Sequence, residues 1–105
     1  MRAIVNGKTY NTETATRICD VPSRVQDRGN FSWHDTDLYR TKRGAFFVAG
    51  RGNAASMWGE SDGSGGRWGG SGVRPVSEQE ARDYMEAAGC DEADFTAVGL
   101  PLDEA

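Results

Sequence analysis

The segment from residue 37 to residue 51 constrains the fold more than any other part of the sequence. Two runs rich in aromatic and branched residues, 38–41 and 45–49, flank a basic turn that ends at Gly44. Such runs favour strands, and a glycine at this position can adopt the left-handed conformation of a tight turn. Because side chains alternate along a strand, the two faces should carry Phe46 with Val48 and Phe47 with Ala49. The pattern predicts a β-hairpin at the centre of an antiparallel sheet.

Residues 3–10 predict a second hairpin. Asn6-Gly7 stands between two short strand-like runs, and this pair tolerates the positive φ angles of a type I′ turn best. Residues 11–19 are ambiguous, because their polar start could cap a short helix while their threonines also suit a strand. We expect a short helix, with a strand as the alternative, and Pro22 should end either one.

Residues 77–89 predict the main helix of the chain. Ser77 and Glu80 form the S-x-x-E pattern of a capping box, and Gly89 supplies a left-handed stop. An apolar stripe with helical spacing should pack on the sheet. The stripe consists of Ala81, Tyr84, Met85 and Ala88.

Glycine is frequent between residues 50 and 72, which hold nine of the 14 glycines. This composition predicts a long Gly-rich loop, above all over residues 59–72, and long loops in compact domains are often functional or mobile. Trp58 and Trp68 should hold the loop against the body, because an exposed indole is costly. Residues 73–76 then predict a short edge strand.

These elements predict an α+β fold: a small antiparallel β-sheet with one main C-terminal α-helix packed on it and a long Gly-rich loop. A chain of 105 residues has the size of a single domain, residues 1–105. Cys19 and Cys90 are far apart and show no metal-ligand spacing. Two free thiols are the expected state, and one disulfide is the alternative.

The sequence contains no recognisable catalytic motif. Asp35 and Asp37 could orient the single histidine, His34, but no G-x-S-x-G elbow leads into a helix. Residues 50–55 begin like a nucleotide-binding loop, yet they lack the third glycine and a βαβ context. One histidine also leaves too few donors for zinc. We therefore expect no enzyme, no metal and no cofactor.

Charge is divided unevenly along the chain. Residues 1–76 carry eleven basic and seven acidic residues, a net charge of +4, whereas residues 77–105 carry nine acidic residues and one arginine, a net charge of −8. An acidic surface favours cationic partners and repels nucleic acid. It could be a solubilising helix face or a docking surface for a basic protein. The candidate partner-binding residues are Glu78, Asp83, Glu86, Asp91, Glu92 and Asp94.

A second candidate surface is basic and aromatic. Arg40, Lys42 and Arg43 surround the turn of the central hairpin, and Trp33 lies shortly before it. Cations interleaved with aromatic rings are the ingredients of single-stranded nucleic-acid binding. The net charge of −4 and a pI near 4.9 oppose such binding. Nucleic acid is therefore the alternative partner.

Residues 5–15, 38–47 and 69–81 resemble the corresponding stretches of small proteins encoded on bacterial phages and integrative elements. These stretches are turns, a hairpin and a capped helix, so the resemblance implies no catalytic residue. Size, acidity and this association also resemble anti-CRISPR proteins, which block a Cas effector by direct binding, some by imitating the charge of DNA. The resemblance implies a non-catalytic, protein-binding inhibitor.

The partner would then be a bacterial defence complex, a Cas effector, in the cytoplasm of the bacterial host cell. Residues 1–7 place a run of three consecutive apolar residues before a turn, too few for a secretory leader. No run approaches the roughly 20 apolar residues of a membrane span. We expect a cytoplasmic protein without membrane contact, and the sequence leaves its oligomeric state open.

Overall fold

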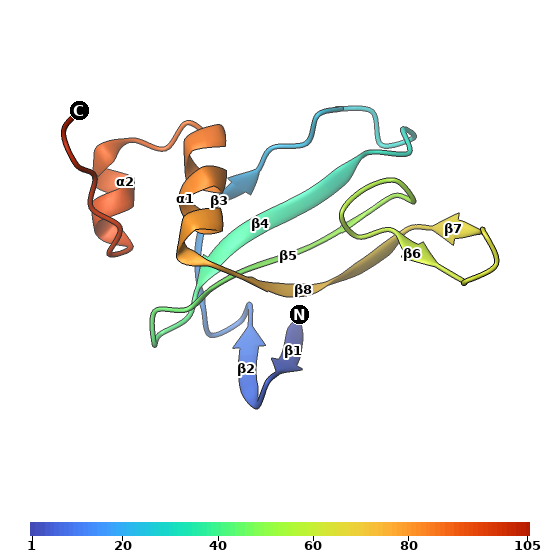
Figure 1. The fold of residues 1–105 in the computed structure, drawn as a ribbon, viewed down its shortest axis with the longest axis horizontal. Helices are drawn as coiled ribbons and strands as arrows, with labels where there is room; N and C mark the ends of the chain where they lie inside the picture. The colour runs from blue at the N-terminus through green and yellow to red at the C-terminus, as the bar shows by residue number, and fades with distance from the viewer.

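A four-stranded antiparallel sheet, in the order β3-β4-β5-β8, forms the centre of a computed structural model that describes residues 1–105 (Figure 1). Its strands span Thr16–Val21 (β3), His34–Arg40 (β4), Phe46–Gly52 (β5) and Gly70–Val76 (β8). β4 and β5 form the predicted central hairpin, and Gly44 in its turn has a φ of 91°. The predicted α+β fold is confirmed, and β8 is an edge strand as expected.

Two C-terminal helices, α1 (Glu78–Ala87) and α2 (Glu92–Ala97), lie at one end of the molecule, and α1 packs on the sheet (Figure 1). The predicted capping box is present: the Glu80 N–H donates to Ser77 Oγ, and the Ser77 N–H donates to a Glu80 carboxylate oxygen, each at 3.0 Å. Neither helix is long and apolar enough to cross a membrane. The core on this side consists of Cys19, Val21, Leu38, Phe46, Val48, Trp58, Ala81, Met85, Phe95 and Leu100.

The apolar stripe predicted for α1 is correct in its middle and wrong at its end. Ala81 and Met85 are fully buried, and Tyr84 is half-buried against the same core. Ala88 is exposed. The helix has already ended at Ala87, and Ala88 forms the C-cap, whose N–H donates to the Tyr84 carbonyl.

The other face of the sheet is covered by a hairpin of β1 (Arg2–Val5) and β2 (Lys8–Asn11). Asn6 and Gly7 in its turn have φ angles of 51° and 74°, so both central residues have the positive φ that a type I′ turn requires.

Phe47 holds this second face together. Its ring stacks on Tyr39 with centroids 5.1 Å apart and meets Tyr10 of β2 edge-on at 5.7 Å. Phe47 and Ala49 therefore belong to a different core cluster from Phe46 and Val48, as the alternation along the strand predicts.

The helix predicted over residues 11–19 is wrong, and the alternative strand forms. Asn11 ends β2 and shapes a turn in which its Oδ1 accepts the Glu13 N–H at 2.9 Å. β3 then pairs with β4 and buries Cys19. Ladder hydrogen bonds and burial outweigh the weak local helix signal, and the strand ends directly before Pro22.

The Gly-rich segment is more ordered than the predicted long loop. Two short strands, β6 (Glu60–Ser61) and β7 (Arg67–Trp68), form a small hairpin. Trp58 is buried as expected, but Trp68 is 51% exposed. A Cβ at Gly59 would collide with the carbonyl oxygen of Ala54, so at least one glycine serves close backbone packing.

The two cysteines are free thiols that lie in one core region. Burial raises the pKa of Cys19 to about 12, and the neighbouring Cys90 thiol adds to the shift. The Cys19 thiol is therefore protonated at neutral pH and unreactive.

Candidate functional site

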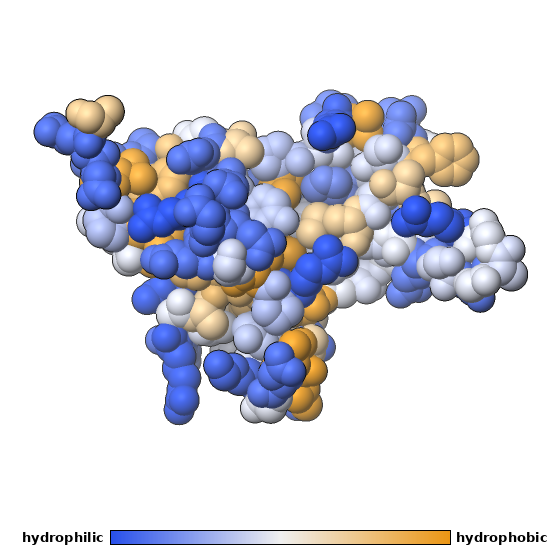
Figure 2. Space-filling model, viewed as in Figure 1, coloured by the Kyte–Doolittle hydropathy of each residue, from blue (hydrophilic) through white to orange (hydrophobic).

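The predicted acidic surface exists as a set of exposed carboxylates on α1, α2 and the turn between them. All six predicted residues, Glu78, Asp83, Glu86, Asp91, Glu92 and Asp94, are exposed. The only ion pair of the C-terminal segment joins Arg82 to Glu78 at 3.9 Å, and both side chains are partly exposed, so the pair contributes little. No arginine or lysine of residues 1–76 pairs with these acids. Figure 2 shows hydrophilic side chains over this end of the molecule.

The six carboxylates have different local roles. Asp91 and Asp94 form a second capping box, in which each accepts the backbone N–H of the other at 3.0 Å. Asp83 accepts a hydrogen bond from the Gln79 side chain at 3.0 Å. The side chains of Glu86 and Glu92 make no ion pair within the chain. The capping role of Asp91 and Asp94 was missed in the sequence, although their spacing resembles that of Ser77 and Glu80.

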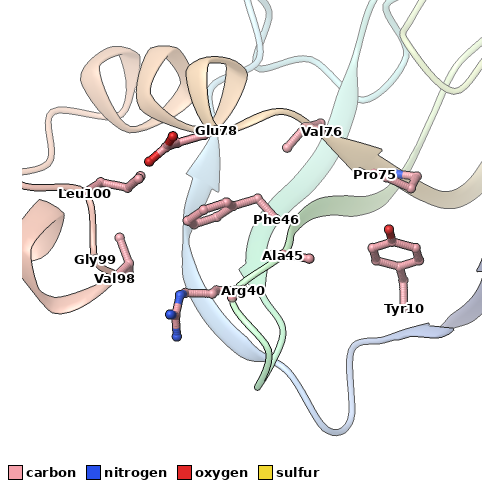
Figure 3. A pocket seen from close by; sticks show the side chains of 11 residues that line it. Tyr10, Arg40, Ala45, Phe46, Pro75, Val76, Glu78, Val98, Gly99 and Leu100 are labelled. Carbon is pink, nitrogen blue, oxygen red and sulfur yellow. The ribbon is translucent and has the colours of Figure 1, made fainter. Parts of the chain in front are cut away.

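A cleft of about 390 Å³ borders the acidic surface where the start of α1 approaches the central hairpin. Figure 3 shows Arg40 from the sheet and Glu78 from α1 at this cleft, with Phe46 between them in this view. The two charged groups form no ion pair with each other, and Arg40 Nε is buried without a hydrogen-bond partner. The lining of the cleft therefore includes a cation, an anion and an apolar ring.

The predicted basic and aromatic surface is not one site. Arg40 ends β4 and Lys42 and Arg43 lie in the turn after it, whereas Trp33 directly precedes the start of β4. A seven-residue strand separates its ends by roughly 20 Å. The structure therefore places Trp33 at the opposite end of β4 from the three cations, so the four residues do not form one cluster.

Trp33 instead lies beside two arginines that the sequence analysis did not select. The guanidinium carbons of Arg28 and Arg51 lie 5.4 and 5.9 Å from its ring centroid, within the range of cation–π attraction. The three residues come from two segments that are distant in sequence, so no local pattern could have predicted the cluster.

His34 belongs to a buried polar network. Its Nδ1 lies 2.9 Å from Thr36 Oγ1, which also accepts the Trp58 indole N–H at 2.7 Å. Burial lowers the pKa of His34, and the negative charge of Asp35 opposes this shift. Asp37 pairs with Arg17 at 2.9 Å. The His34 imidazole thus contacts the Thr36 hydroxyl, which also binds the Trp58 indole, and this arrangement stabilises the packing of the three side chains.

We expect the free energy of unfolding to fall between about pH 7.5 and about pH 5.5 because of His34. The unfolded chain takes up the proton near the ordinary histidine pKa, while the folded chain resists it because its His34 pKa is lowered. The stabilisation is present above the ordinary pKa and is lost as the pH falls through the folded value. Urea unfolding of the wild type and of His34→Gln at both pH values measures the effect. An equal pH dependence in the two proteins would contradict it.

No group of three or more histidine, cysteine, aspartate or glutamate side chains is placed to hold a metal ion. Comparison of the chain with protein-family models, with curated proteins and with solved structures gives no match.

Proposed function

We propose that the protein binds a cationic surface of another protein through the acidic surface of α1 and α2, and that it thereby inhibits a nucleic-acid-handling complex of the Cas effector kind. The observation that carries this proposal is that basic residues of the chain do not neutralise these carboxylates. The exposed carboxylates of residues 77–105 meet only one weakly placed arginine of their own segment. An anionic surface left unpaired in the folded chain is available to lysines and arginines of a partner.

The choice of partner follows from charge. Protein surfaces that hold nucleic acid are rich in lysine and arginine, because they neutralise phosphates. A rigid helical surface that carries several carboxylates can occupy such residues in place of the phosphates. The resemblance to anti-CRISPR proteins supports a Cas effector as the complex to test first.

The proposal is tested by binding to purified guide-loaded Cas effectors in the presence and absence of target DNA. We expect the protein to bind the free effector, to be excluded when DNA is bound first, and to bind more weakly as the salt concentration rises. Binding that is insensitive to both DNA and salt would contradict an electrostatic competition. If no effector binds, the assignment of this partner class fails.

A further inference from the structure

Exposed aromatic side chains gather at the end of the sheet away from α2 and the β4–β5 turn. Phe31 is 75% exposed and Trp68 is 51% exposed, and the half-buried Trp33 carries the two arginines described above. In Figure 1 this end comprises the segment between β3 and β4 and the β6–β7 hairpin. Large rings left in water at one end of a sheet indicate a binding surface.

Asn53 ties the loop before β4 to the end of β5. Its backbone N–H donates to the Trp33 carbonyl at 2.9 Å, and its side-chain amide donates to the Arg28 and Asn30 carbonyls at 2.7 and 2.8 Å. The Ala55 N–H donates to the Phe31 carbonyl at 2.8 Å. The backbone that carries Phe31 and Trp33 is therefore fixed.

The third aromatic residue, Trp68, directly precedes a glycine that packs at this end of the sheet. A Cβ at Gly69 would lie 2.6 Å from the Gly52 carbonyl oxygen, so the chain directly after Trp68 packs against the end of β5. Between these segments lies an open cleft of about 480 Å³, which we name the tryptophan cleft. Its lining includes Arg28, Trp33, Arg51, Asn53, Gly69 and Gly70.

The arginines of the tryptophan cleft are without anionic partners. Neither Arg28 nor Arg51 forms an ion pair, although Asp35 lies opposite Arg51 on the neighbouring strand. Arg67, next to Trp68, is also unpaired. Asp27 is held in its own turn, where it accepts the Gly29 N–H at 2.9 Å.

Two guanidinium groups beside one indole, with no carboxylate bound to either, favour a ligand that brings several negative charges. The exposed rings of Phe31 and Trp68 favour a ligand that also brings flat apolar surfaces. Single-stranded nucleic acid has both, whereas a duplex keeps its base faces stacked. We propose that the tryptophan cleft binds single-stranded nucleic acid, with phosphates at Arg28 and Arg51 and bases stacked on Phe31 and Trp68.

The test is a titration of intrinsic tryptophan fluorescence with oligothymidylate and oligouridylate of about fifteen nucleotides. We expect quenching, and a logarithm of the binding constant that falls with the logarithm of salt concentration with a slope of about −1.4 for two phosphates. The double variant Arg28→Ala, Arg51→Ala should flatten this slope to near zero. Phe31→Ala and Trp68→Ala should each weaken binding by about fivefold or more, read by fluorescence anisotropy of labelled oligonucleotide.

The matched control is the double variant Arg2→Ala, Lys8→Ala, which removes the same charge from exposed, unpaired residues of the β1–β2 hairpin. We expect it to bind like the wild type, and circular dichroism checks that each variant folds. No binding of either oligonucleotide overturns the proposal, as does an equal loss in the control. If the cleft variants weaken only the binding of a protein, the cleft belongs to a protein partner and the proposal is wrong.

Discussion

Replacement of Phe47 by alanine should lower the free energy of unfolding by about 3–5 kcal/mol. Phe47 is fully buried and contacts Tyr39 and Tyr10 through its ring, so the substitution removes the apolar burial, leaves a cavity and breaks two aromatic contacts. Domains of this size have only about 5–15 kcal/mol of stability in total. The variant should therefore be partly unfolded at moderate temperature, as measured by urea titration of far-UV circular dichroism.

Two controls locate the cause in packing. Phe47→Leu keeps most of the volume and should cost less than the alanine variant. Ile4→Ala removes an apolar side chain that is 69% exposed on the hairpin that covers Phe47, and it should change stability by no more than about 0.5 kcal/mol. A loss of under about 1 kcal/mol in Phe47→Ala would show that the β1–β2 hairpin does not depend on this ring.

The importance of Phe47 could be expected from the sequence only in part. The alternation in residues 45–49 assigns it to the face opposite Phe46, and the structure confirms this. What covers that face depends on where residues 1–11 pack, which is a contact between distant segments. A contact between distant segments also explains why the helix predicted over residues 11–19 was wrong, because pairing with β4 decides between helix and strand.

The site residues divide in the same way, into those that local sequence determines and those that distant segments bring together. The six acids of the C-terminal segment were predictable because helix spacing and net charge are local properties of the chain. The cluster of Arg28, Arg51 and Trp33 was not, because it forms only when the loop before β4 meets the end of β5. The 51% exposure of Trp68 contradicts the expectation that this indole packs against the body of the domain.

Reversal of three charges on the acidic surface should weaken binding to a cationic partner by at least about 100-fold. The variant is Asp83→Lys, Glu86→Lys, Glu92→Lys. It spares Asp91 and Asp94, whose capping bonds support α2, so the helices should persist. Like charges then face each other across the interface, which lowers the association rate most strongly at low salt. Surface plasmon resonance at several salt concentrations measures this loss.

The matched control changes the same number of charges elsewhere, as Glu13→Lys, Asp35→Lys, Glu60→Lys. These residues are exposed and make no ion pair. Each triple variant removes three negative charges and adds three positive ones, so both change the net charge from −4 to +2. A general effect of net charge would weaken both variants equally and would contradict the acidic surface as the docking site. Loss confined to the helical variant would assign the binding to the surface of α1 and α2, because only the position of the charges differs between the two proteins.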